Sequence, residues 1–182
     1  MKRLLLLLSL LLLGTGCATR LTGVDYQTLQ PNFDLFQFFE GDVVAYGVVQ
    51  NRHGDVVQKF TVDIHGTVDG DLLTLNERFI YTLGDGVRTR VWTIARDAAG
   101  GYHGRAGDIL GAAKGRTFGN AFQWEYQMDL PVGDRHVRVR FNDWIWALDA
   151  QHIVNRSYIQ KFGFDVAEVT LFMQRKSLAA KP

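Results

Sequence analysis

Cysteine and serine are scarce in this chain of 182 residues. The single cysteine, Cys17, rules out a disulfide within the chain, even in an oxidising compartment. Beyond the first 16 residues, serine occurs only at Ser157 and Ser177, and the sequence contains no Gly-x-Ser-x-Gly motif. A serine hydrolase is therefore not expected, because that class presents its nucleophile in such a motif.

An excess of charge of one sign is also missing. The chain carries 20 Lys and Arg against 19 Asp and Glu, for a formal net charge of +1. No nucleic-acid partner is expected, because such partners require a basic excess or a basic stripe. The five histidines are scattered and show no HxH or HExxH spacing, so neither a metal nor another cofactor is expected.

A long apolar run occurs at the N-terminus. Residues 2–3 are basic, residues 4–13 are almost all leucine, and residues 14–16 are small. This order is typical of a signal peptide. The run is too short to cross a hydrocarbon core of roughly 30 Å, which needs about 20 apolar residues. We therefore expect residues 1–16 to be a cleaved signal peptide.

Cys17 follows the small residues directly. This arrangement resembles the lipobox of bacterial lipoproteins, although Gly14 stands where that motif usually has Leu. The resemblance implies that Cys17 is the lipidation site, carries acyl chains such as palmitate and becomes the first residue after cleavage. Ala18, in place of Asp, implies a lipid anchor at the periplasmic face of the outer membrane. The alternative is an ordinary secretory signal that happens to contain a cysteine.

The remainder of the chain is expected to form one domain. Residues 17–32 are polar and lack periodicity, so we expect a lipidated tether. Residues 33–176 are expected to be a single β-barrel domain, and residues 177–182 a flexible tail.

Alternation of apolar and polar residues dominates after residue 40 and predicts an all-β protein. A series of strands joined by short turns exposes two edges unless it closes, so we expect an antiparallel, up-and-down, lipocalin-like barrel of about nine or ten strands. Residues 35–39 are expected to form a short N-terminal helical turn. Barrels of this size either fill their interior or hold one small ligand. The expected strands cover 43–50, 59–65, 72–83, 87–96, 102–112, 117–130, 136–146, 152–161 and 165–175. The strands at 102–112 and 117–130 are expected to meet at a turn formed by Lys114-Gly115.

A series of short motifs extends over most of the chain, and it resembles the DUF3833 family of proteobacterial lipoproteins. The resemblance implies an exported lipoprotein and supplies no mechanism. The motifs include Leu75-Asn76-Glu77-x-Phe79, Arg90-x-Trp92, Gly104-x-Ala106-x-Asp108, Gly119-Asn120-Ala121, Trp124-x-Tyr126, Asp143-Trp144 and Asn155-Arg156-Ser157.

Several polar side chains fall on otherwise apolar strand faces. Alternation places Glu77, Arg90, Asn120 and Asp143 on faces that would point into a barrel, and Asp108 is a further candidate. A hairpin through residues 84–86 would bring Glu77 and Arg90 near each other diagonally. Because buried charges need partners, we expect these two residues to pair inside the barrel.

This pattern has three interpretations. First, the polar groups form a structural network of ion pairs that closes one end of the barrel. Second, they orient a lipid or fatty-acyl ligand in a pocket with apolar walls. Third, their carboxylates are catalytic. We expect the chain to bind or carry a small apolar ligand, and assign no catalytic residue. A non-enzymatic envelope scaffold with a filled barrel, and an acyl-lipid-modifying enzyme, are the alternatives. The candidate interior site comprises Glu77, Arg90, Trp92, Asp108, Asn120, Trp124, Tyr126 and Asp143.

Overall fold

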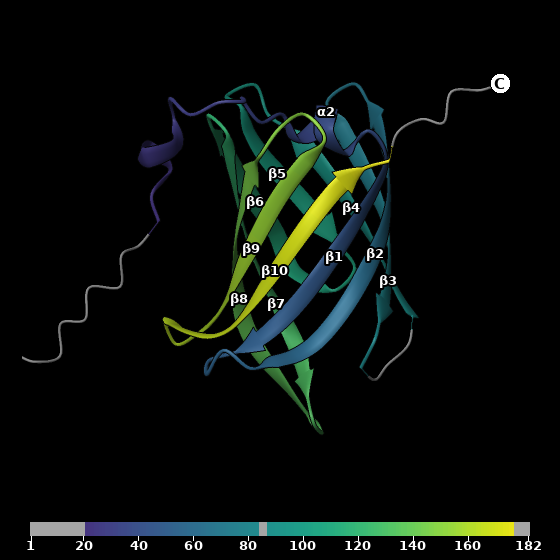
Figure 1. The fold of residues 1–182 in the computed structure, drawn as a ribbon, viewed down its shortest axis with the longest axis vertical. Coiled ribbons are helices and arrows are strands. Elements are labelled where there is room, and N and C mark those ends of the chain that lie inside the picture. Colours follow the sequence, from purple (N-terminus) through teal and green to yellow (C-terminus); the bar gives the residue numbers. More distant parts are fainter. Residues whose placement is uncertain (1–20, 84–86, 177–182) are drawn as a thin grey trace, which may run out of the picture.

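The structure is a computed structural model that describes residues 21–83 and 87–176. In that part of the chain, ten consecutive antiparallel strands close into an up-and-down barrel (Figure 1). The predicted fold class is therefore confirmed. The strands are β1 Gly41–Asn51, β2 Val56–Asp69, β3 Leu72–Tyr81, β4 Val87–Arg96, β5 Gly101–Ala106, β6 Ile109–Phe118, β7 Ala121–Val132, β8 Arg135–Ala147, β9 His152–Lys161 and β10 Phe164–Arg175.

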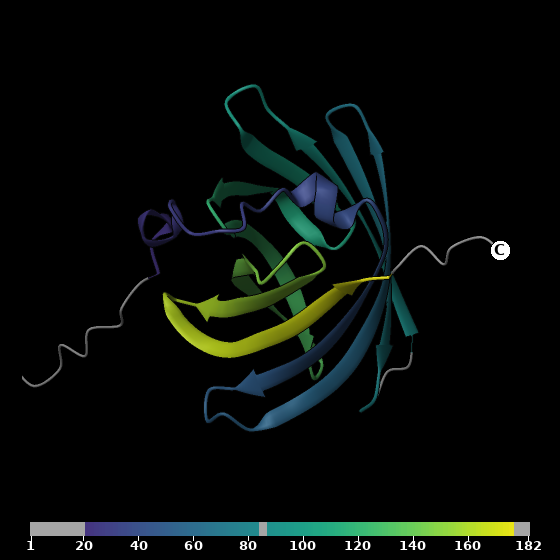
Figure 2. The ribbon, with the colours of Figure 1, turned by 45° about the horizontal axis from the view of Figure 1, so that its top comes forward.

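A short helix, α2 (Leu35–Phe39), lies across one end of the barrel, which we call the α2 end (Figure 2). It begins after Asp34, whose Oδ1 accepts hydrogen bonds from the backbone N–H groups of Phe36 at 2.9 Å and Gln37 at 3.1 Å. These bonds satisfy donors that the first helical turn cannot satisfy itself. The helical turn predicted at residues 35–39 is thus present. No helix among the described residues has the length and apolar character needed to cross a membrane.

Pairing of the first strand with the last closes the barrel. β1 and β10 run antiparallel with Val43 opposite Arg175. The Arg175 guanidinium donates hydrogen bonds to the backbone carbonyl oxygens of Phe38 at 3.1 Å and Glu40 at 3.0 Å, and also contacts that of Gln37. The end of the last strand therefore fastens α2 over the barrel.

Aromatic rings pack together at the α2 end of the barrel. The Tyr102 ring lies 5.9 Å from the ring of Phe36 and 5.3 Å from that of Phe122. The Phe33 ring contacts those of Phe38 and Phe122 at 6.0 and 6.1 Å. These rings form a packed layer that closes this end of the barrel interior.

The turn between β5 and β6 differs from the prediction. The two strands were expected to meet at Lys114-Gly115, but Gly107 and Asp108 form the turn and residues 114–115 lie within β6. A Cβ on Gly115 would come within 2.4 Å of the Trp124 ring. Gly115 therefore provides room for that indole instead of a chain reversal, and the sequence alone does not separate these two uses of glycine.

The described part of the expected tether packs on the outer wall of the barrel. A 3₁₀ turn, η2 (Gly23–Tyr26), brings the Tyr26 ring 5.6 Å from Trp144 and 6.1 Å from Trp146. Trp144 points outward from β8 yet is only 1% exposed. The expected signal peptide, the tail and Cys17 lie outside the described residues, and the division into these segments stays a prediction.

Candidate functional site

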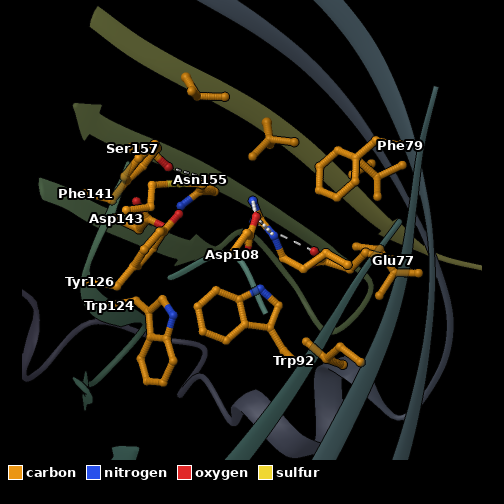
Figure 3. Close-up of a pocket in the computed structure, with 18 of the residues that line it drawn as sticks. Glu77, Phe79, Trp92, Asp108, Trp124, Tyr126, Phe141, Asp143, Asn155 and Ser157 are labelled. Atoms are coloured by element: carbon orange, nitrogen blue, oxygen red, sulfur yellow. Dashed lines mark hydrogen bonds and ion pairs between the residues drawn. The ribbon is translucent and has the colours of Figure 1, made fainter. Parts of the chain in front are cut away.

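A cavity of about 480 Å³ runs inside the barrel from α2 toward the opposite end, and Figure 3 shows side chains that line it. Leu35 and Phe39 of α2 close it at its inner end, and it opens opposite α2, where Arg88, Asp129 and Pro131 are among its outermost lining residues. Its walls are mainly apolar. The polar side chains deeper inside are Glu77, Arg90, Tyr126, Asp143, Asn155 and Ser157, with Asp108 beside Arg90.

Arg90 is the centre of the charged group. β3 and β4 pair so that Glu77 lies directly opposite Arg90, with 4.0 Å between Oε2 and Nη1. The stronger partner is Asp108, whose Oδ2 accepts from Nη2 at 2.7 Å and from Nε at 2.9 Å. The predicted proximity of Glu77 and Arg90 is thus present, although the two residues are opposite and not diagonal. Asp108 reaches the pair because it sits in the β5–β6 turn.

Burial dominates the titration of Glu77. Its side chain is 13% exposed, and Oε2 has no hydrogen-bond partner among the described residues. Loss of solvation raises the pKa of this carboxyl from 4.5 to about 7, because the charged form is disfavoured away from water. The positive charge of Arg90 opposes the shift, and the negative charges of Asp108 and Asp143 add to it.

Asp143 is the second buried carboxyl. In the sheet it lies opposite Trp124 of β7 and Ser157 of β9. Burial raises the pKa of Asp143 from 3.8 to about 7, against the opposing effects of the nearby Ser157 hydroxyl, the charge of Arg90 and the nearby Tyr126 hydroxyl. Its Oδ1 is buried without a hydrogen-bond partner in the described part of the chain.

The other charges around the cavity already have partners. Burial acts to lower the pKa of the Arg90 guanidinium, but nearby Tyr126, Glu77 and Asp108 outweigh it and raise this pKa above its usual value. Asp129, at the mouth, accepts from Arg138 at 3.0 Å. The guanidinium of Arg88 lies over the Tyr81 ring at 6.0 Å. Glu77 and Asp143 are thus the two interior carboxyls with unsatisfied oxygens.

Aromatic side chains form the wall beside Asp143. The Trp92 ring makes edge contacts with those of Trp124 at 5.7 Å and Tyr126 at 5.4 Å. Tyr126 stacks on Phe141 at 4.8 Å. Burial first, and the charge of Asp143 next, raise the pKa of the Tyr126 hydroxyl well above its usual value, so it is a hydrogen-bond donor in the neutral range.

Seven of the eight predicted interior residues line the cavity, and Asn120 does not. Asn120 lies in the turn between β6 and β7 at the α2 end, where its carbonyl oxygen accepts from the Ala147 N–H at 2.8 Å. The prediction failed because residues 117–130, expected to be one strand, contain the β6–β7 turn at residues 119–120.

Sequence reasoning missed two polar residues of the site, Asn155 and Ser157. The Asn155 amide donates to the Trp144 carbonyl oxygen, and the Ser157 hydroxyl donates to Asn155 Oδ1, both at 3.2 Å. The signal was available, because Ile153, Asn155, Ser157 and Ile159 alternate along one face of β9 and are all buried. Applying the alternation rule to this strand finds both residues.

Exposed apolar side chains surround the mouth of the cavity, and we call them the apolar rim. They lie at or beside the turns opposite α2. Phe162, in the β9–β10 turn, is 89% exposed and holds a left-handed backbone with φ of 52°. An apolar molecule entering the barrel would meet these side chains first. The rim comprises Val56, Val57, Leu83, Val87, Val132, Phe162 and Phe164.

No group of three or more His, Cys, Asp or Glu side chains within residues 21–83 and 87–176 is arranged to hold a metal ion. The described chemistry of the site is therefore that of carboxyls, one shared guanidinium, hydroxyls and aromatic rings.

Comparisons with known proteins identify a family and a fold. Residues 11–175 match the DUF3833 family, described as a protein of unknown function. Among solved structures, the chain is similar to an S-type phycobiliprotein lyase from Guillardia theta, with a TM-score of 0.55 and 11% identity over 78% of this chain and 90% of the lyase. No curated protein matches the sequence. At this identity, the similarity to the lyase concerns the fold alone.

Proposed function

The chain belongs to the DUF3833 family, and we propose that it is an outer-membrane lipoprotein whose barrel binds or carries a small apolar or lipid ligand. The observation that carries this proposal is the cavity of about 480 Å³ with apolar walls and a few converging polar groups. Its size lies within the range of about 300–1,000 Å³ that is typical of small-molecule sites. Each methylene buried there would contribute about 0.8 kcal/mol to binding.

The cavity argues against a scaffold with a filled barrel. Side chains do close the α2 end, where the rings of Phe36, Tyr102 and Phe122 pack together. The interior beyond them remains hollow, although Glu77 and Asp143 lie within it at a desolvation cost that pure packing would avoid. A ligand that occupies this space would account for both features.

The lipid anchor at Cys17 is part of the proposal and is supported by the order of the N-terminal segments. The described chain begins at residue 21, and η2 packs on Phe118 and Trp144 near the α2 end. Residue 21 lies four positions after Cys17, and these four steps of the chain span at most about 14 Å. A lipid on Cys17 would therefore hold the α2 end toward the membrane and leave the apolar rim facing away from it.

Displacement of an apolar fluorescent probe tests ligand binding directly. Val62 of β2 lines the cavity, and its neighbour Thr61 points outward. We expect Val62→Trp to weaken probe binding at least tenfold and Thr61→Trp to leave it unchanged, with urea unfolding used to confirm that both variants fold. Val169→Phe is a milder cavity-filling variant. Absence of probe binding by the wild-type chain, together with absence of co-purifying lipid in mass spectra of the native protein, would refute the proposal.

One observation favours the acyl-lipid-modifying enzyme as a second candidate. Glu77 and Asp143 both have pKa values near 7, which suits general acid or base catalysis at neutral pH. If the barrel is such an enzyme, Glu77→Gln or Asp143→Asn must abolish conversion of an acyl lipid while the free energy of unfolding is retained. Conversion that survives in both variants rejects this role for the two carboxyls.

A further inference from the structure

We propose that the ligand carries an ammonium group at its polar end and that Glu77 and Asp143 hold this group by hydrogen bonds and charge. This inference rests on the proposed function, since it names the head group of the same ligand. It narrows the range of expected ligands. A ligand with a free carboxylate at its polar end is excluded, and an apolar chain in the cavity is retained.

The first support is the two carboxyl oxygens that lack partners. Glu77 Oε2 and Asp143 Oδ1 are buried and accept no hydrogen bond from any described residue. Both residues line the cavity, on its opposite sides in Figure 3. Buried acceptors of this kind are normally satisfied, so their presence in a hollow site points to a ligand that donates hydrogen bonds.

The second support is the balance of charge. Two cations and four carboxyls line the cavity, namely Arg88, Arg90, Glu77, Asp108, Asp129 and Asp143, and Asp129 pairs with Arg138. Arg90 is held by Asp108 at 2.7 Å, and Arg88 lies at the mouth over Tyr81. When all carboxyls are ionised, the interior therefore has an excess of negative charge. A bound carboxylate would increase that excess, whereas an ammonium group would reduce it.

The third support is the aromatic wall beside Asp143. Trp124 and Tyr126 are buried and line the cavity, as does Trp92, whose ring already has the Arg90 guanidinium over it at 5.9 Å. Aromatic faces attract cations through the ring quadrupole, and the interaction strengthens where water is excluded. A carboxylate next to such rings forms a site that prefers an ammonium group over an uncharged alcohol.

The proposal predicts a characteristic dependence on pH. Burial holds the pKa values of Glu77 and Asp143 near 7, so each is largely protonated at pH 5.5. An alkylammonium, which titrates near pH 10 like a lysine side chain, binds best when both carboxyls are ionised. Its affinity should therefore rise with pH by up to tenfold per unit for each proton released. An alkylcarboxylate should show the opposite trend, and the phenols of Tyr81 and Tyr126 stay neutral in this range because their pKa values are raised.

The test compares dodecylamine, dodecanol and dodecanoate as competitors of an apolar fluorescent probe on the full chain, below their micelle concentrations. At pH 8 we expect the amine to bind at least tenfold more tightly than either other compound, and at pH 5.5 we expect this advantage to shrink. Glu77→Gln and Asp143→Asn should each lower the affinity for the amine severalfold and leave that for dodecanol within twofold. Asp63→Asn is the matched control, because Asp63 points outward from β2, is paired with Lys176 at 2.9 Å and is not among the residues that line the cavity.

The outcomes separate this inference from the proposed function. Three results would overturn the ammonium site while probe binding stands. The amine and the alcohol could bind equally well, or dodecanoate could bind more tightly than the amine. The preference for the amine could also survive in the doubly substituted Glu77→Gln, Asp143→Asn protein. A wild-type chain that binds neither the probe nor dodecanol would instead refute the proposed function itself. If the two substitutions unfold the chain, the competitor series on the wild-type protein at the two pH values still decides whether the site prefers an ammonium group.

Discussion

Raising the pH from 5 to 8 forces two buried carboxyls, Glu77 and Asp143, to ionise inside the barrel. Burial raises the pKa of each to about 7, from 4.5 for Glu77 and 3.8 for Asp143. The folded chain therefore binds more protons than the unfolded chain between these values. Stability is greatest below the unfolded-state pKa values and is lost as the pH rises through 7. We expect the ligand-free barrel to be more stable at pH 5 than at pH 8.

The size of this effect follows from the pKa shifts. With folded-state pKa values of about 7, each carboxyl should lower the free energy of unfolding by about 2.5 kcal/mol between pH 5 and pH 8. The two carboxyls repel each other, so their effects will not add strictly. Asp143→Asn keeps the shape of the side chain and removes its charge. This variant should therefore lose about 2.5 kcal/mol less than the wild type over the same range.

Urea unfolding of the ligand-free full chain at pH 5, 6, 7 and 8 measures these differences. Asp129→Asn serves as control, because hydrogen bonding to Arg138 lowers the pKa of Asp129 and so puts its titration below this range. Its stability should change with pH as that of the wild type does. A wild-type free energy of unfolding that stays constant from pH 5 to pH 8, or an Asp143→Asn variant that loses as much as the wild type, would refute the reasoning.

Substitutions at three further positions probe the α2 end and the rim. Asp34→Ala removes the cap of α2 and should lower the free energy of unfolding by about 1 kcal/mol. Asp34→Asn should retain most of the stabilisation by this cap, because the Asn side chain also accepts hydrogen bonds from the first helical turn. Gly66→Ala should lower the free energy of unfolding by about 2 kcal/mol or more, since the new Cβ would lie 1.8 Å from the Phe39 carbonyl oxygen. An unchanged urea midpoint would contradict that close approach. Phe162→Gly should raise the free energy of unfolding by about 0.5 kcal/mol, because glycine adopts the φ of 52° without strain. A loss of stability would instead show that the Phe162 ring packs against other side chains.

Much of the interior site could be predicted because side-chain direction in a strand is a local property. Successive residues point to opposite faces, so an acidic residue in register with apolar neighbours is assigned to the interior without knowledge of the fold. This argument correctly placed Glu77, Arg90 and Asp143. It applies equally to Asn155 and Ser157 on β9, which were missed because the rule was not applied to that strand.

The turns limited the prediction. Glycine occurs both in chain reversals and beneath large rings, and composition does not distinguish the two. The expected reversal at Lys114-Gly115 proved to be a strand that accommodates Trp124, and the true reversal at Gly107-Asp108 brings Asp108 to Arg90. Asp108 was thus a candidate site residue from the sequence, but its pairing with Arg90 depended on the position of a turn.

The sequence by itself determined the all-β class, the up-and-down order of the strands and the inward direction of Glu77 and Asp143, because periodicity and turn residues act over a few neighbouring positions. Only the tertiary structure decided that the barrel is closed at the α2 end and hollow beyond it, and that Asp108 is the main ion-pair partner of Arg90. It also decided that an oxygen of each interior carboxyl has no partner among the described residues. These properties depend on contacts between strands distant in sequence, whose separation and register are set when the barrel closes.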